Sequence, residues 1–224
     1  MIPIAEIFYS IQGEGKTIGS PALFLRLAGC DVNCIWCDTK EVWMKGKAFK
    51  KEEIIQKVKE LSDKNIHLII TGGEPLIFNE FLNELCKEVI EHFRIIEIET
   101  SATRKPFGFI AENKRIFYNT SPKLKNSKVP REKRINKQAI EFFLNSKRAI
   151  FKFVIENEED VIEAIEDFIK PFNIPHELVY LMPQSKNRKE FIERSLIVVE
   201  FCKKYKFNFS PRLQLVIWDM ATGV

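Results

Sequence analysis

Short runs of β-branched and aromatic residues alternate along this chain with longer segments of helical periodicity. The apolar runs lie at 22–27, 68–71, 95–99, 116–120, 149–155, 178–181 and 207–210. Between several of them apolar residues recur every three or four positions, at 51–62, 80–92, 158–169 and 189–204. Strands that alternate with helices build βαβ units and a mainly parallel sheet. The sequence therefore predicts an α/β fold, either a doubly wound sheet or most of a barrel.

The segment 158–169 is the clearest helix of the set. Val161, Ile162, Ile165 and Phe168 fall on one predicted face, and Asn157 is a candidate N-cap. The lone cysteines at 86 and 202 also sit among apolar residues of predicted helices, so we expect both to be buried core residues.

Three cysteines lie close together directly after the first predicted strand. Cys30, Cys34 and Cys37 form a C-x3-C-x2-C triplet. Three thiolates can hold a 4Fe–4S cluster and leave one iron open for a ligand from outside the protein. A zinc site needs a fourth Cys or His, and only Cys86 or Cys202 could be recruited in space. A disulfide with a free thiol would need an oxidising compartment, which nothing in the sequence supports.

Polar or glycine-rich residues follow four of the predicted strands. They are the cysteine segment 29–37, Thr-Gly-Gly-Glu-Pro at 71–75, Glu-Thr-Ser at 99–101 and Ser-Pro-Lys at 121–123. In both architectures ligands gather at the carboxyl ends of parallel strands. The sequence therefore predicts that these four segments share one site.

Two of these segments resemble motifs of the radical S-adenosylmethionine (SAM) superfamily. They are the cysteine triplet, with Trp36 before its third cysteine, and Gly-Gly-Glu-Pro at 72–75. In that superfamily the amino and carboxylate groups of SAM chelate the open iron, and the second motif contacts the SAM amino group. The resemblance implies the radical SAM core over 1–224 as a single domain: a partial (βα)6-type, TIM-like barrel with a mostly parallel sheet.

A narrower resemblance begins at the N-terminus. Glu-Ile-Phe-Tyr-Ser-Ile-Gln-Gly-Glu-Gly at 6–15, with 24–30 and Trp-Cys-Asp-Thr at 36–39, resembles the 7-carboxy-7-deazaguanine synthase family. Such a carbon–nitrogen lyase of queuosine and archaeosine biosynthesis converts 6-carboxy-5,6,7,8-tetrahydropterin to 7-carboxy-7-deazaguanine with loss of ammonia. A 5′-deoxyadenosyl radical takes hydrogen from C6, and Mg²⁺ assists the ring contraction.

The resemblance also implies a role for particular residues, although it names no catalytic acid or base. The cluster ligands are Cys30, Cys34 and Cys37, and the Mg²⁺ ligand is Thr39. The SAM-binding residues are Trp36, Asp38, Gly73, Ser121, Pro122, Lys123 and Gln184. The substrate-binding residues are Ile11, Gln12, Gly13, Arg26 and Thr71.

Residue chemistry leaves alternatives open at several of these positions. Arg26 lies in an apolar strand and needs a partner, which is either a structural carboxylate or the substrate carboxylate. Thr39 is either a Mg²⁺ ligand or a helix cap. Glu14 is expected to help read the 2-amino-pyrimidinone edge of a pterin. A C-terminal substrate contact stays open between Arg212 and Gln214.

Charge and hydropathy limit the partners. The net charge of +4, from 35 basic and 31 acidic residues, is too small for a nucleic-acid protein, and no apolar run could span a bilayer. We expect a cytoplasmic protein, because no signal peptide is evident. The resemblance adds a homodimer and an external one-electron reductant such as flavodoxin or ferredoxin.

One segment, 123–137, contains seven Lys or Arg residues and one Glu. It is either an anion-binding or RNA-contacting loop, or a solvated, mobile surface loop. Two other functions therefore stay open beside the synthase. One is another radical SAM enzyme, such as a glycyl-radical activase, and the other is a zinc- or nucleic-acid-binding module.

Overall fold

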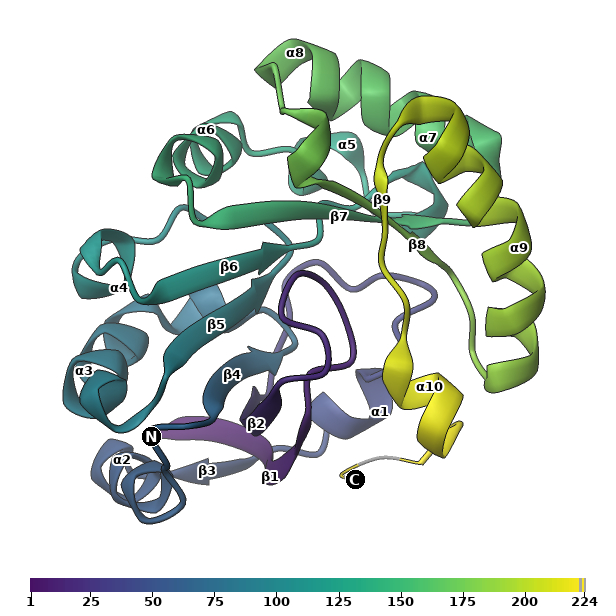
Figure 1. Ribbon diagram of the computed structural model, residues 1–224. Helices are drawn as coiled ribbons and strands as arrows, with labels where there is room; N and C mark the ends of the chain where they lie inside the picture. Colours follow the sequence, from purple (N-terminus) through teal and green to yellow (C-terminus); the bar gives the residue numbers. More distant parts are fainter. Residues whose placement is uncertain (222, 224) are drawn as a thin grey trace.

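The computed structural model describes residues 1–221 and 223, and its centre is one nine-stranded sheet (Figure 1). The strands are β1 (Ile2–Ile11), β2 (Pro21–Leu27), β3 (Lys47–Phe49), β4 (His67–Gly72), β5 (Ile95–Thr100), β6 (Ile116–Thr120), β7 (Ala149–Ile155), β8 (Val179–Pro183) and β9 (Asn208–Phe209). Their order is β3-β1-β2-β4-β5-β6-β7-β8-β9. All pairs from β2 to β9 along this order are parallel, which confirms the predicted mostly parallel sheet.

The sheet curves but is open, with β3 at one edge and β9 at the other. It therefore has the form of a partial barrel, as expected. β1 and β3, which pair antiparallel at one edge, were not predicted. β1 mixes apolar residues with Pro3, Glu6 and Ser10, and only Ile2 and Ile4 in it are buried, so its sequence lacks the pattern of a core strand.

The helices lie mainly on the convex side of the sheet (Figure 1). They are α1 (Lys40–Trp43), α2 (Lys51–Glu60), α3 (Asn79–Val89), α4 (Phe109–Glu112), α5 (Arg131–Arg134), α6 (Lys137–Ser146), α7 (Glu158–Ala164), α8 (Lys170–Phe172), α9 (Arg188–Tyr205) and α10 (Leu213–Trp218). The four predicted helices are present as α2, α3, α7 and α9, with a π-helical turn at Ile165–Ile169 extending α7.

For the helix that begins at Glu158, one prediction from the sequence is confirmed and another is wrong. The Asn157 side chain accepts a hydrogen bond from the Asp160 backbone N–H at 3.1 Å, as an N-cap does. Ile162, predicted on the buried face, is 47 % exposed, while its neighbour Val161 is fully buried. The mistake arises because four apolar positions span a wider arc than this helix buries.

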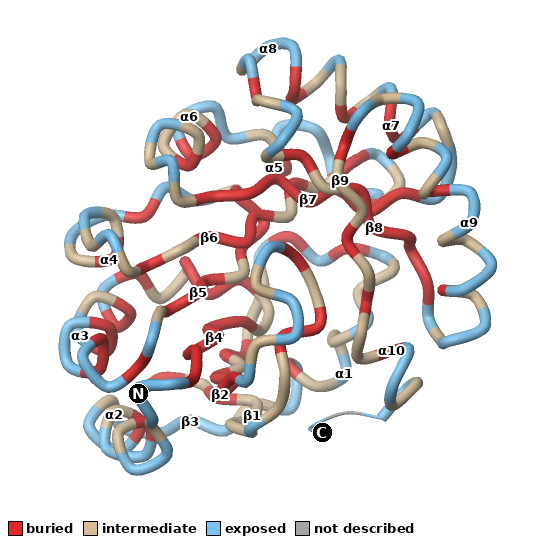
Figure 2. The backbone as a smooth tube through the Cα atoms, viewed as in Figure 1, coloured by how far each residue is buried: buried red, intermediate tan, exposed pale blue. Residues whose placement is uncertain are grey.

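The main core lies between the helices and the convex face of the sheet, and Figure 2 shows the strands as the buried layer. Ile96 and Ile98 of β5 belong to this core, whereas Glu97 and Glu99 alternate with them on the other face. Thr71 lies beside Arg26, and Asn119 lies beside Glu99, in neighbouring strands. The concave face of the sheet therefore carries a band of polar side chains.

The basic segment 123–137 is largely solvated, as one of the two alternatives expected, but part of it is helical and anchored rather than a mobile loop. It contains a 3-10 turn at Lys125–Ser127 and the helix α5. Arg134 is 5 % exposed and forms ion pairs with Glu163 at 2.7 Å and Asp167 at 3.8 Å. Arg131 pairs with Asp167 as well, at 3.0 Å. Acidic side chains of the α7 region thus anchor part of the segment, which sequence spacing does not reveal.

None of the helices in the described part of the chain is both long and apolar enough to cross a membrane.

Candidate active site

A cleft of about 690 Å³ lies over the concave face of the sheet, at the carboxyl ends of its parallel strands. It brings together nearly all the predicted site residues: Ile11, Gln12, Gly13, Arg26, Cys30, Cys34, Trp36, Cys37, Asp38, Thr39, Thr71, Gly73, Ser121, Lys123 and Gln184. Of the predicted set, Pro122 alone is missing from the cleft lining in the described chain, and it is buried. Its neighbours on both sides reach the cleft, and successive side chains of an extended segment point in opposite directions.

The three cysteines lie on the loop that follows β2. Their thiols form a small cluster with Val32, and the Ile35 N–H donates to the carbonyl of Ser127 at 3.0 Å, which ties the loop to the segment after β6. Burial raises the pKa of the Cys30 and Cys34 thiols.

This loop favours a cluster over a single zinc ion. Across residues 1–221 and 223, no three His, Cys, Asp or Glu side chains are placed to hold one metal ion. Cys86 and Cys202, the candidates for a fourth zinc ligand, lie in the hydrophobic core, as predicted. All five cysteines are free thiols. With Cys86 and Cys202 in the core and no fourth thiol beside them, three cleft-lining cysteines fit an inorganic cluster with a vacant iron.

The turn after β4 is built for close backbone approach. A Cβ on Gly73 would lie 1.9 Å from the Gly29 carbonyl oxygen and 2.8 Å from Cys30 Cβ, so only glycine fits beside the cysteine loop. Glu74 is fully buried and accepts hydrogen bonds from Thr100 Oγ1 at 2.8 Å and the Ser101 N–H at 2.7 Å. Glu74 thereby joins this turn to the end of β5, while Gly73 lines the cleft.

Aromatic and polar side chains continue the wall beside the cysteines. The Lys123 ammonium lies 5.6 Å from the centre of the Trp36 ring and donates to Ser121 Oγ at 3.0 Å. Trp36 Nε1 donates to Asn126 Oδ1 at 3.3 Å. Gln184, at the end of β8, is held by the Arg194 guanidinium.

Arg26 has the structural partner that the sequence left open, and it also lines the cleft. Its Nε donates to Glu6 Oε1 at 2.6 Å. Within the described chain, its terminal Nη atoms make no hydrogen bond. Thr39 is the N-cap residue of α1, yet its side chain makes no capping bond with the residues that the structure describes. The Arg26 Nη atoms are therefore available to the cleft, whereas the Thr39 hydroxyl lies 3.7 Å from the Cys37 thiol, within hydrogen-bond range of sulfur.

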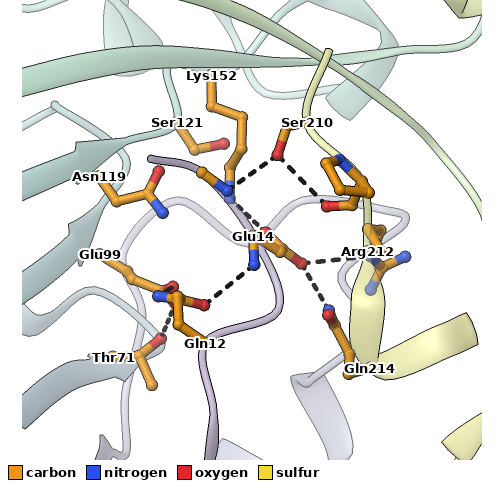
Figure 3. A network of polar contacts seen from close by, with 12 residues as sticks. Gln12, Glu14, Thr71, Glu99, Asn119, Ser121, Lys152, Ser210, Arg212 and Gln214 are labelled. Atoms are coloured by element: carbon orange, nitrogen blue, oxygen red, sulfur yellow. Dashed lines mark hydrogen bonds and ion pairs between the residues drawn. The ribbon is translucent and has the colours of Figure 1, made fainter. Parts of the chain in front are cut away.

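Two carboxylates on β5, the buried Glu97 and the half-buried Glu99, support the substrate side of the cleft. Gln12 Nε2 donates to Glu97 Oε1 at 2.7 Å and to Glu99 Oε1 at 3.1 Å. Thr71 Oγ1 donates to Glu99 Oε2 at 2.7 Å (Figure 3). Burial and the nearby Glu99 charge raise the pKa of Glu97 to about 7. Glu97 was not among the predicted site residues, although two carboxylates alternating with isoleucines in one strand were a usable signal.

Glu97→Gln is expected to remove a pH dependence of stability. The folded-state pKa of about 7 lies above the ordinary 4.5, so protonated Glu97 stabilises the fold below pH 4.5 and this contribution is lost as pH rises through 7. The glutamine side chain in the variant is uncharged at every pH. Relative to the unaltered protein, its free energy of unfolding should rise by about 3 kcal/mol between pH 4.5 and 8. Urea denaturation at both pH values measures this, and a constant difference would contradict it.

Glu14, expected to help bind the pterin, lines the cleft, but its carboxylate is already paired with protein groups. It forms ion pairs with Lys152 and with Arg212, whose Nε lies 3.3 Å from Glu14 Oε1, and accepts from Gln214 Nε2 at 2.7 Å (Figure 3). Burial opposes ionisation, but the charges of Lys152 and Arg212 prevail and lower the pKa of Glu14 to about 2. Lys152 was not predicted as a site residue, although a lone charge in the apolar run of β7 was a usable signal.

The same network joins the two ends of the chain. The Leu213 N–H donates to the Gly13 carbonyl at 2.9 Å, and the Gly15 N–H donates to Ser210 Oγ at 3.0 Å. In Figure 1 the C-terminal segment (yellow) passes beside the loop after β1 (purple). Arg212 also pairs with Asp38 and donates to the Ser185 carbonyl at 2.6 Å. The C-terminal segment thus holds the Gln12–Gly15 loop in place.

Comparison with known proteins agrees with this arrangement. The family model of the radical SAM superfamily matches residues 25–193. A 7-carboxy-7-deazaguanine synthase from Pyrobaculum aerophilum is 37% identical over 224 residues, which cover 99% of this chain and 97% of the relative. This chain belongs to the 7-carboxy-7-deazaguanine synthase family.

Two further similarities support this membership. A 7-carboxy-7-deazaguanine synthase from Thermoplasma acidophilum is 36% identical over 99% of both chains. The crystal structure of QueE from Escherichia coli matches with a TM-score of 0.73 and 26% identity, over 95% of this chain and 94% of that one. As a 7-carboxy-7-deazaguanine synthase of the radical SAM superfamily, the chain uses a 4Fe–4S cluster and SAM.

Proposed function

We propose that the cleft converts 6-carboxy-5,6,7,8-tetrahydropterin to 7-carboxy-7-deazaguanine, by hydrogen abstraction at C6, ring contraction and loss of ammonia. The single observation that supports this most is the shared cleft, where the Cys30, Cys34 and Cys37 thiols meet Gly73 and the Gln12 loop. The cluster side and the polar face of the sheet lie on the same 690 Å³ space, so a radical source and a polar bicyclic substrate can be neighbours.

The residues of the cysteine side would hold the cofactors. The three thiols would bind the cluster, and Gly73, Trp36, Asp38, Ser121, Lys123 and Gln184 would bind SAM. When bound, the cluster and SAM supply a one-electron reduction that yields the 5′-deoxyadenosyl radical. The protein itself binds and orients the reactants. Pro122 would act by shaping the backbone between Ser121 and Lys123, because it lies outside the cleft lining.

The predicted substrate-binding residues on the sheet side of the cleft would bind the pterin: Ile11, Gln12, Gly13, Arg26 and Thr71. Glu99, whose carboxyl group is oriented by Gln12 and Thr71, takes the role we first expected of Glu14, because its oxygens can accept from N–H donors of the pterin edge. The terminal nitrogens of Arg26 suit the substrate carboxylate.

Gln214 is the better candidate for the C-terminal contact. Its Oε1 is buried and has no hydrogen-bond partner in residues 1–221 and 223, and the side chain lines the cleft. Its Nε2 is bonded to Glu14, and its Oε1 is packed where a Cβ on Gly13 would lie 2.0 Å away, so the amide would have to turn for that oxygen to accept from the substrate. Arg212 is instead occupied by Glu14, Asp38 and Ser185.

Thr39 would contribute a hydroxyl to Mg²⁺, which takes most of its ligands from water and substrate oxygens. Thr39→Val keeps the shape of the side chain and removes that hydroxyl. We expect its rate with Mg²⁺ to fall about tenfold, to the rate of the unaltered protein in EDTA, while Thr39→Ser keeps the stimulation. Initial rates against Mg²⁺ concentration measure this. If Mg²⁺ stimulated Thr39→Val as strongly as the unaltered protein, Thr39 would not be a Mg²⁺ ligand.

The proposal also includes the wider setting of the enzyme. We propose a single domain over 1–224, a cytoplasmic homodimer, and an external one-electron donor such as flavodoxin or ferredoxin. Five free thiols suit a reducing compartment. Ion pairing of Arg131 and Arg134 leaves segment 123–137 less suited to nucleic acid, so we propose no nucleic-acid partner.

The direct test is anaerobic turnover by the reconstituted protein with SAM, dithionite, Mg²⁺ and 6-carboxy-5,6,7,8-tetrahydropterin. We expect 7-carboxy-7-deazaguanine and 5′-deoxyadenosine in the products. SAM cleavage without the deazapurine would point to another substrate in the same cleft. Absence of both products in a protein loaded with iron and sulfide would refute the proposed function.

A further inference from the structure

The guanidinium of Arg212 joins three separate parts of the active-site cleft. Its Nε lies 3.3 Å from Glu14 Oε1, in the loop after β1, where the two side chains meet (Figure 3). Its Nη1 donates to the Ser185 carbonyl, after β8, at 2.6 Å. Its Nη2 pairs with Asp38, on the loop that carries the three cysteines. Each nitrogen of the guanidinium thus has a partner on a different segment of the chain.

These partners lie on both sides of the cleft, which all of them line. Asp38 stands between the third cysteine and the residue proposed for Mg²⁺, and it is itself proposed to bind SAM. Ser185 directly follows Gln184, another residue proposed for SAM. Glu14 lies in the Gln12–Gly15 loop on the pterin side. Arg212 therefore connects the cofactor side of the cleft with the pterin side.

The connection is buried and anchored. The Arg212 side chain is only 7% exposed, and the next residue, Leu213, donates its N–H to the Gly13 carbonyl at 2.9 Å. A guanidinium is planar and its N–H groups point in fixed directions, so the three partners are held relative to one another. A lysine ammonium is a point charge on a flexible stem and cannot hold three partners in one geometry.

We propose that Arg212 is a positioning residue that sets the distance between the SAM side and the pterin side of the cleft. The inference rests on the proposed function, in which the C6–H bond of the pterin breaks homolytically and a C–H bond forms at C5′ of the 5′-deoxyadenosyl radical. The two carbons must be neighbours for this transfer, and a misplacement of about 1 Å costs about 100-fold in rate. Arg212 acts on the transfer through Asp38 and Glu14.

The test compares two Arg→Lys variants. Arg212→Lys keeps the charge and removes the planar fork. Arg148→Lys is the matched control, because Arg148 also holds several partners: it donates to the carbonyls of Asn113 at 2.6 Å and Ile116 at 2.7 Å, at the amino end of β6.

Turnover is measured with dithionite, SAM, Mg²⁺ and 6-carboxy-5,6,7,8-tetrahydropterin. In Arg212→Lys we expect deazapurine formation to fall about 100-fold, and 5′-deoxyadenosine released per deazapurine to rise at least about tenfold, because radicals form that do not reach C6. Arg148→Lys should keep both values of the unaltered protein. An unchanged ratio of the two products in Arg212→Lys would overturn the inference, since a general loss of structure lowers both together.

Hydrogen exchange of the reconstituted protein tests the positioning without turnover. In Arg212→Lys, backbone N–H groups of both 12–15 and 36–43 should exchange about tenfold faster, whereas Arg148→Lys should alter neither segment. Faster exchange confined to 210–218 would show that Arg212 holds only its own segment, and it would overturn the inference. Failure of the unaltered protein to form the deazapurine would instead refute the proposed function, and the exchange of the two loops would still report on Arg212.

Discussion

Cys34→Ser should abolish both SAM cleavage and formation of the deazapurine. Cys34 is 6 % exposed and packs with Val32 and Val129, and in the proposed site its thiolate would be one of three protein ligands of the cluster. A hydroxyl is a poor ligand for iron at that position. Removing a residue that only hydrogen-bonds a metal ligand lowers metal affinity or activity roughly 10–100-fold. Removing a ligand itself should therefore lower the rate by at least about 100-fold. Bound iron and the visible absorbance of the reconstituted protein should fall together with activity.

Cys202→Ala is the matched control for this change. Cys202 is also buried, at 7 % exposure, but it lies in the core between α9 and β9, where its thiol donates to the Asn208 carbonyl at 3.5 Å. This variant should keep its iron and its activity and lose at most a few kcal/mol of stability. Equal loss of iron in both variants, or full activity of Cys34→Ser, would contradict the assignment of the triplet.

Glu14→Ala should cause one of the largest losses of stability in the chain. The side chains of Lys152 and Arg212 are only 6% and 7% exposed, and both pair with Glu14. Removing the carboxylate leaves two buried cations without this partner, so we expect the free energy of unfolding to fall by about 3–5 kcal/mol at pH 7. Denaturant titration measures this. Glu200→Ala, which breaks the exposed Lys203 pair on α9, should cost less than about 1 kcal/mol.

The pH dependence of the Glu14 effect follows from its depressed pKa. The folded-state pKa of about 2 lies below the ordinary 4.5, so Glu14 stabilises the fold above pH 4.5 and this contribution is lost as pH falls toward 2. The difference between Glu14→Ala and the unaltered protein should therefore shrink below pH 4.5. Adding Lys152→Met to Glu14→Ala should recover part of the lost stability, because it removes one of the two buried cations that Glu14→Ala deprives of this partner. A loss that is independent of pH would show that Glu14 contributes by packing alone.

The sequence predicted those features that depend on local patterns. The bounds of β6 and β7 match the predicted runs, because β-branched and aromatic residues fill strands that are buried on both faces. The shared cleft was also predictable, since the carboxyl ends of parallel strands meet at one edge whatever their side chains are.

The unpredicted features depend on contacts between distant segments. Glu14 and Arg212 lie 198 positions apart, and no spacing rule joins them. The buried charge of Lys152 could be located, but its partner could not, because β7 and the loop after β1 meet only in the folded chain. Arg134 looked like one more solvated cation for the same reason, until Glu163 and Asp167 proved to be its partners.

The most direct measurement of the central claim is transfer of hydrogen from the substrate to SAM-derived product. The reconstituted protein is supplied with 6-carboxy-5,6,7,8-tetrahydropterin that carries deuterium at C6, and the 5′-deoxyadenosine is analysed by mass spectrometry. If the cleft places C6 beside the radical source, one deuterium should appear in 5′-deoxyadenosine as 7-carboxy-7-deazaguanine forms. Turnover that yields 5′-deoxyadenosine without deuterium would contradict the account.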